Sequence, residues 1–182
     1  PVAFVADGEA SELGSAPHAT IARVIVHESA SRGGQELPGT LCDAMVIPRF
    51  ATSILRQILD EQVTQGEHGQ LAGVPASTAR AVPADAHLAP RALAAEQSNS
   101  SVGYVTSLLF KLFRAIEEGP HPEDELGRFL AGGDFTHASR LTGGIEYRRP
   151  SAEPALLGSL MELTPSQGDA WRLSVDSVAR FY

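Results

Sequence analysis

A single lysine inside an apolar run is the feature that most limits how this chain can fold. The 182 residues include fourteen cationic side chains, and all but Lys111 are arginine. Lys111 lies in the run SLLFKLF, residues 107–113. Lysine is a compact point charge on a flexible stem, whereas arginine is a planar fork, so the two are not interchangeable. The run predicts a β-strand whose charge either extends to water at a sheet edge or serves a binding site.

Composition bounds the class of protein. A hydrophobic content of 43% is enough for a sizeable core, and the net charge of −8 argues against nucleic acid or an anionic membrane as a partner. No run of about 18 apolar residues and no signal-peptide pattern occurs, so we expect a cytoplasmic protein. The only cysteine, Cys42, fits a reducing compartment and is expected to be a buried apolar side chain. No paired His or Cys spacing predicts a metal site.

The first half of the chain predicts two strands and one long helix. Residues 1–5 and 20–26 are rich in β-branched side chains, and residues 29–38 are typical of a loop. Apolar residues at three- and four-residue spacing predict a helix over 43–63, with Pro48 in or near its first turn. Residues 64–90 are rich in Gly, Ala, Pro and His, and predict a loop with one short strand.

The second half predicts one antiparallel sheet of about five strands with a helix against it. Strands are expected at 91–95, twice within 102–116 around a turn near Thr106, at 141–148 and at 155–163. A helix is expected from Pro122 to about Ala131, because Pro and three acids suit a first turn and Gly132 follows. A polar linker at 164–169 precedes a further helix from residue 170. Both ends fall inside predicted elements, so we expect a piece of a longer protein.

Several of these elements together are typical of a kinase-type nucleotide site. Phosphoryl transfer depends on positioning and charge neutralisation, which need a phosphate loop, a lysine and a carboxylate that holds the lysine. The loop candidate is the small polar stretch Gln97, Ser98, Asn99, Ser100 and Ser101, although it contains no glycine. The lysine is Lys111. Its expected partner is Glu125 on the acidic helix, with Leu126 and Leu130 toward the core, and Asp124 is the alternative.

A hinge strand would then present its backbone to adenine. The apolar strand that ends at Met161, Glu162 and Leu163 suits this role, with Met161 near the back of the adenine pocket. Met161 is equally well explained as an ordinary core residue. The polar loop is equally typical of a turn, and Glu125 of a surface acid that complements the helix dipole.

Five segments give a more specific resemblance. AEQSNSSV, LLFKLFR, HPEDELGRFL, GGIEYRRP and PSQGDAW, which lie between residues 95 and 171, closely resemble bacterial maltokinases, in particular the maltokinase part of trehalose synthase–maltokinase fusion proteins. The resemblance is strong over about 90–182 and weaker over 1–90. The chain departs from the family at His121, where Asn is frequent, and at Ser166 and Ala170, which replace Asn and Gly.

The resemblance implies an α+β fold, the small lobe of a protein-kinase-like enzyme similar to aminoglycoside phosphotransferases. Residues 1–37 would be part of an N-terminal cap domain. Residues 38–182 would form an intermediate subdomain and the small lobe, with 164–182 as hinge and first helix toward a C-terminal lobe. That lobe would carry the catalytic residues and the ligands for Mg²⁺, because this chain has no H-x-D catalytic loop followed by a metal-binding D-F-D or D-F-G segment.

The implied activity is transfer of the γ-phosphate of ATP to the anomeric hydroxyl of maltose, giving maltose 1-phosphate for α-glucan and glycogen synthesis. The possible associated partner is a trehalose synthase domain. Two alternatives stay open: the small lobe of a kinase for another sugar such as glucosamine, and a non-catalytic interaction module. The side facing the expected second lobe, with Val102, Leu163, Trp171 and the helix after it, is expected to be apolar and exposed, so we expect self-association.

Overall fold

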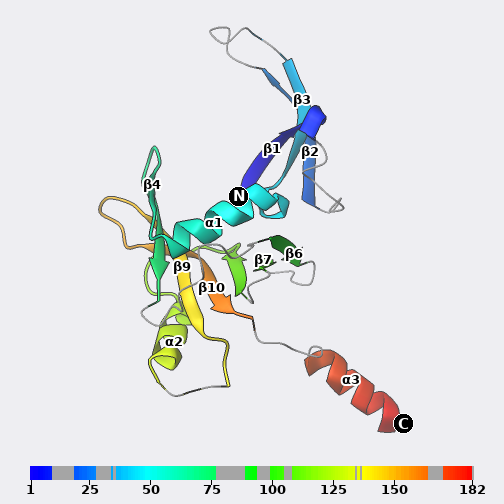
Figure 1. The fold of residues 1–182 in the computed structure, drawn as a ribbon, viewed down its shortest axis with the longest axis vertical. Helices are drawn as coiled ribbons and strands as arrows, with labels where there is room; N and C mark the ends of the chain where they lie inside the picture. The colour runs from blue at the N-terminus through cyan, green and yellow to red at the C-terminus, as the bar shows by residue number, and fades with distance from the viewer. Residues whose placement is uncertain are drawn as a thin grey trace.

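The computed structural model describes residues 1–9, 19–27, 34, 36–76, 89–93, 99–104, 108–133, 135, 137–163 and 170–181. These residues form an α+β structure with two antiparallel sheets and three α-helices (Figure 1). The predicted α+β class is therefore confirmed. Within the described residues no helix is both long and apolar enough to cross a membrane.

The smaller sheet is N-terminal and has the strand order β1-β3-β2. Strand β1 is Val2–Ala6, β2 is Thr20–His27 and β3 is Glu36–Asp43. Both outer strands were predicted, whereas the central strand β3 was not, because its sequence ELPGTLCD contains Pro and Gly and was interpreted as the end of a loop. The expected domain boundary after residue 37 falls inside β3. Gly39 is required there, because a Cβ atom would lie 2.4 Å from the Phe4 ring.

The larger sheet has seven strands in the order β4-β5-β9-β10-β8-β7-β6, and every neighbouring pair is antiparallel (Figure 1). Five of them were predicted: β6 (Pro90–Leu93), β7 (Asn99–Tyr104), β8 (Leu108–Phe113), β9 (Leu141–Arg148) and β10 (Ala155–Glu162). The turn expected near Thr106 lies outside the described residues. Strands β4 (Val63–Gln65) and β5 (Gln70–Pro75) extend the sheet beyond the one short strand expected from residues 64–90.

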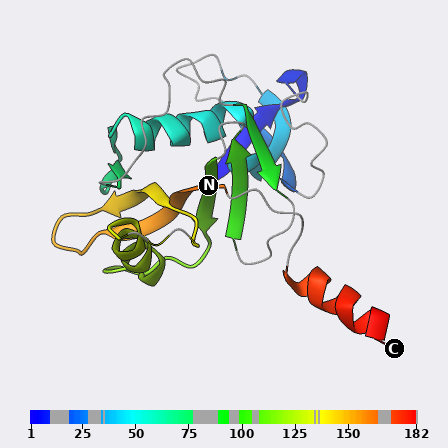
Figure 2. The same ribbon diagram turned by 60° about the horizontal axis from the view of Figure 1, so that its bottom comes forward.

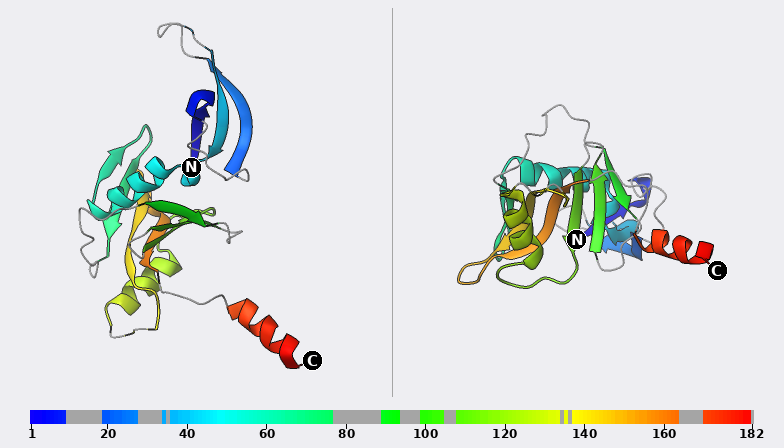
Figure 3. Two further views of the ribbon diagram at one scale, coloured as in Figure 1. Left: turned by 45° about the vertical axis from the view of Figure 1, so that its right-hand side comes forward. Right: turned by 90° about the horizontal axis from the view of Figure 1, so that it is seen from below.

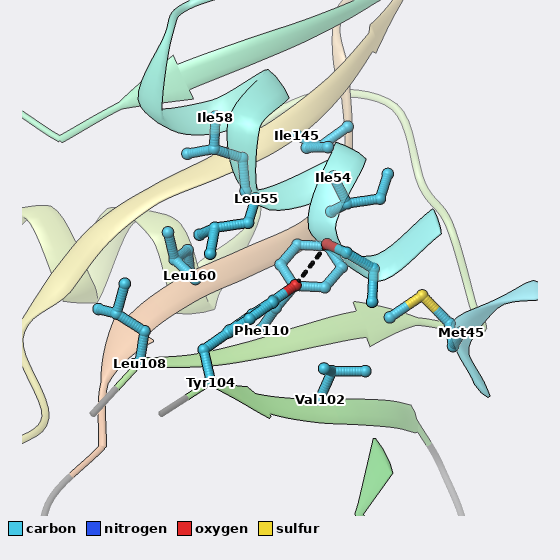
Figure 4. Packing of buried hydrophobic residues seen from close by; sticks show 11 residues of the cluster. Met45, Ile54, Leu55, Ile58, Val102, Tyr104, Leu108, Phe110, Ile145 and Leu160 are labelled. Atoms are coloured by element: carbon cyan, nitrogen blue, oxygen red, sulfur yellow. Dashed lines mark hydrogen bonds between the residues drawn. The ribbon is translucent and has the colours of Figure 1, made fainter. Parts of the chain in front are cut away.

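Helix α1 (Pro48–Leu59) covers one face of the large sheet. It is shorter than the 43–63 expected, because Ala44–Val46 form a separate 3-10 turn whose start is capped by the Asp43 carboxylate. Pro48 occupies the first turn, as predicted. The buried side chains of α1 pack on the even-numbered side chains of β7 and β8 and on side chains of β9 and β10 (Figure 4). The largest fully buried side chains of this core are Leu55, Ile58, Val102, Phe110, Ile145 and Leu160.

A buried hydrogen bond and a close approach of two backbones fix α1 on the sheet. The Tyr104 hydroxyl donates to the Ala51 carbonyl oxygen at 2.8 Å inside the core (Figure 4). Burial raises the pKa of Tyr104 well above its ordinary value. At the other end of the helix, a Cβ atom on Gly73 of β5 would lie 1.8 Å from the Gln57 carbonyl oxygen. Only glycine therefore allows α1 and β5 to approach so closely.

The remaining helices occupy different positions. Helix α2 (Pro122–Ala131) lies on the opposite side of the large sheet from α1 (Figure 2). Its bounds match the prediction. Helix α3 (Ala170–Phe181) stands apart from both sheets (Figure 3), and its side chains are exposed, including Trp171, Leu173, Val178 and Phe181. The polar linker expected at 164–169 lies outside the described residues.

Candidate functional site

The strand register places small and polar residues in one row beside Lys111. On β7, Ser101 is the direct partner of Lys111, and on β10 Ser159 is its partner on the other side. Gly144 of β9 pairs in turn with Ser159. Paired positions on neighbouring strands point to the same face of a sheet, so these residues share one face. It is the face opposite α1, because Phe110, the neighbour of Lys111, packs under α1.

Lys111 forms an ion pair with the first turn of α2. Its Nζ lies 2.8 Å from Glu123 Oε2, and the two side chains are 24% and 30% exposed. Nζ also lies 5.7 Å from the centroid of the Phe113 ring, within the range of a cation–π contact. The expected helix does supply the carboxylate, but the expected residue was wrong. Glu125 is exposed, and Asp124 binds Arg128 Nε at 2.7 Å instead.

Helix α2 faces the sheet through a different side from the one we expected. Leu126 and Leu130 were expected toward the core, yet Leu126 is 58% exposed and Leu130 is only half-buried. The contact face runs through Gly127, where a Cβ atom would lie 3.1 Å from Leu141 on β9. Gly127 is four residues after Glu123, and residues at this spacing share a helix face. The glycine was therefore the signal in the sequence that Glu123, and not Glu125, faces the sheet.

The start of α2 is fixed by His121. Its Nδ1 accepts a hydrogen bond from the Glu123 backbone N–H at 3.2 Å, which makes His121 the N-cap. The imidazole also stacks on the Phe113 ring, with centroids 4.3 Å apart and planes 19° apart. Phe113 is two residues from Lys111 on β8, so the ring anchors α2 to the strand that carries the lysine.

Two polar atoms near Lys111 have no hydrogen-bond partner in the described structure although they are buried. They are Glu123 Oε1 and Ser159 Oγ. The Ser159 residue is completely buried. A buried polar group without a partner costs on the order of 1–3 kcal/mol, so such groups call for an explanation. Glu123 is the ion-pair partner of Lys111, and Ser159 is the partner of Lys111 across the sheet.

The structure places the other predicted site residues as follows. Asn99, Ser100 and Ser101 are not in a loop but form the start of β7, with Ser101 buried. Gln97 and Ser98 lie outside the described residues. Met161 and Glu162 end β10 and are half-buried, and Leu163 follows the strand with 41% exposure.

The expected exposed apolar side is present only in part. Val102 is completely buried under α1, so its assignment to that side was wrong. Leu163 and Trp171 are exposed, as expected.

A hollow of about 350 Å³ lies beside the N-terminus of α2. Its lining includes His121 and the carboxylates of Asp124, Glu146 and Glu153. Asp124 and Glu146 are paired with Arg128 and Arg148. Among the residues the structure describes, no group of three or more His, Cys, Asp or Glu side chains is arranged to hold a metal ion. A search of the chain against models of known protein families finds no match.

Proposed function

We propose that this chain is the nucleotide-binding part of a maltokinase, which transfers the γ-phosphate of ATP to maltose with Mg²⁺. The observation that carries the proposal is the Lys111–Glu123 ion pair across the face of the large sheet opposite α1. A strand lysine held by a helix carboxylate is the arrangement that orients ATP phosphates in kinases. The element order also supports it: two strands, the lysine strand, the acidic helix, and a strand pair that leads toward the expected hinge.

Each residue would have a distinct role. Lys111 would neutralise charge on the α- and β-phosphates, and Glu123 would hold its ammonium group in place. Ser101 and Ser159 flank Lys111 on the neighbouring strands, where both are buried, and would support the lysine rather than contact the nucleotide. Met161, Glu162 and Leu163, at the end of β10, would border the adenine. Chemistry would require the catalytic lobe that the resemblance implies, so we expect no maltose phosphorylation by residues 1–182 alone.

Binding of magnesium ATP tests the site directly. The chain is titrated with a fluorescent ATP analogue in the presence of Mg²⁺, and the same titration is run on variants. Lys111→Met should weaken binding at least about tenfold, because a charge-assisted contact to phosphate is lost. Glu123→Gln should weaken it several-fold. The matched control is Glu125→Gln, which removes the same charge two residues along the helix, at an exposed position, and should leave affinity within about twofold.

Two results would refute the nucleotide site. One is equal affinity of the wild type and Lys111→Met for the ATP analogue. The other is an equal loss of affinity in Glu123→Gln and Glu125→Gln. Circular dichroism of each variant checks that it has folded.

The acceptor sugar is tested with the protein extended beyond residue 182. Phosphate transfer from ATP is measured with maltose, glucose and glucosamine as acceptors, and the product is identified by mass spectrometry and ³¹P NMR. The proposal expects maltose 1-phosphate as the main product. A preference for glucosamine would identify the related sugar kinase instead. Nucleotide binding without transfer to any sugar would favour the non-catalytic interaction module.

A further inference from the structure

His121 connects the strand that carries Lys111 with the helix that carries Glu123. We propose that His121 is a positioning residue of the nucleotide site: its neutral imidazole holds the start of α2 so that Glu123 stays on Lys111, and protonation of the imidazole releases α2. The inference rests on the proposed function and adds a pH-dependent control of the same site.

Three sets of contacts place His121 in this role. Its Nδ1 accepts the Glu123 N–H at 3.2 Å, and its carbonyl oxygen accepts the N–H groups of Asp124 and Glu125, both at 3.0 Å. Its ring stacks on Phe113 at 4.3 Å. The residue whose backbone it caps, Glu123, reaches back to Lys111 at 2.8 Å. The cap, the aromatic stack and the ion pair therefore join residues 121–123, at the start of α2, to residues 111–113 of β8.

The cap depends on the protonation state of the ring. A nitrogen accepts a hydrogen bond only when it carries no proton, so the capping imidazole is neutral with its hydrogen on Nε2. A second proton turns Nδ1 into a donor that faces another donor, the Glu123 N–H. Imidazoles in general take up this proton near pH 6.5, whereas Ser, Thr and Asn caps do not titrate in this range. A histidine cap therefore makes the first turn of α2 sensitive to pH.

Charged groups surround the imidazole from several elements. Asp124 of α2, Glu146 of β9 and Glu153 line the same hollow as His121. Asp124 and Glu146 are already paired with arginines, at 2.7 and 2.9 Å. On the side of β8, Lys111 Nζ lies 5.7 Å from the centroid of the Phe113 ring on which the imidazole stacks.

The single lysine of the chain provides a direct probe. Lysine labelled with ¹³C at Cε gives one signal, from Lys111, which is followed by NMR from pH 8 to pH 5.5 without nucleotide. The wild type should show one titration step in this range. His121→Asn keeps a capping oxygen that does not titrate, so its signal should match the wild type at pH 8 and show no step. His121→Ala should resemble the acid form of the wild type throughout.

The same variants are then compared in nucleotide binding. Wild-type affinity should fall about fivefold from pH 7.5 to pH 5.5, as expected for the loss of one N-cap, and His121→Asn should change less than about twofold. Two NMR results would refute the role of His121. One is a titration step of the Lys111 signal in His121→Asn that equals the wild-type step, and the other is a Lys111 signal in His121→Ala that matches the wild type at pH 8. Absence of any nucleotide binding at pH 7.5 would instead refute the proposed function, and the NMR titration would still decide on His121.

Discussion

Replacement of Gly73 by alanine should test the close packing of α1 on the large sheet. The added Cβ atom would lie 1.8 Å from the carbonyl oxygen of Gln57, 2.5 Å from its carbonyl carbon and 2.9 Å from Ile58 Cα. All three are backbone atoms, so no side-chain rotation relieves the overlap. Ordinary contact begins at 3.4 Å, which means that α1 and β5 must separate by more than 1 Å.

The cost follows from what that separation disturbs. Leu55 and Ile58 are buried at this end of α1, at 0% and 1% exposure. Gln57 Nε2 donates to the carbonyl oxygens of Gln62 and Leu71, both at 2.9 Å, and these bonds would lengthen as well. Overpacking of a core costs about 1–3 kcal/mol, and more where backbone must move. We therefore expect Gly73→Ala to lower the free energy of unfolding by about 3 kcal/mol or more.

Gly103→Ala is the matched control, because Gly103 is also within a strand of the same sheet. Its added Cβ atom would meet no atom closer than 3.9 Å. Alanine reduces the freedom of the unfolded chain, so this variant should be unchanged or up to about 1 kcal/mol more stable. Urea unfolding followed by circular dichroism measures both variants. If Gly73→Ala unfolds at the same urea concentration as Gly103→Ala, the close approach of α1 and β5 is wrong.

Two further predictions concern the core and the exposed helix. Tyr104→Phe removes the bond to Ala51 and should lower the free energy of unfolding by about 1 kcal/mol. Burial raises the pKa of Tyr104, so its neutral form stabilises the fold fully below about pH 10, and this stabilisation is lost as the pH rises further. The wild type should therefore lose more stability than Tyr104→Phe between pH 9 and pH 11, as measured by urea unfolding. The apolar side chains of α3 should cause concentration-dependent association in light scattering over a tenfold range, and a Trp171→Gln, Phe181→Gln variant should reduce it. A wild-type chain that stays monomeric throughout would contradict this expectation.

The elements that were predicted well are those whose pattern is local. The strands β8, β9 and β10 are apolar runs with clear turn residues at their ends, and α2 has Pro at its start and Gly at its end. Hydrophobic periodicity and these boundary residues act within a few positions, so they are visible in the sequence. The bounds of α2 were therefore predicted to the residue.

One strand was missed and another was expected only somewhere within residues 64–90, and both depend on their partners. β3 contains Pro38 and Gly39, and β5 contains Gly73 and ends at Pro75, so both resemble loops when considered alone. Each is stabilised by the strands and helix beside it, and Gly73 allows the close contact with α1. Strand formation of this kind is decided by tertiary contacts and not by local propensity.

The candidate site was predicted at the level of elements but not of every residue. The lysine strand and the acidic helix were correct, whereas the partner of Lys111 depends on how α2 is rotated about its axis. Leu126 and Leu130 suggested one rotation, whereas the contact of Gly127 with Leu141 shows another. Large apolar side chains were thus misleading here, because a small residue defines the side of this helix that approaches the sheet most closely.

The Lys111–Glu123 pair contributes little to the stability of the fold. Both side chains are partly exposed, and ion pairs of this kind contribute about 0–1 kcal/mol to folding. An apolar side chain at position 111 would suit the sheet at least as well, since Leu109 and Phe113 occupy the same face. The neighbouring positions on both sides are serines, one of them buried with an unpaired hydroxyl. Stability alone therefore gives no reason for a lysine at this position, which is consistent with the nucleotide-binding role that we propose for it.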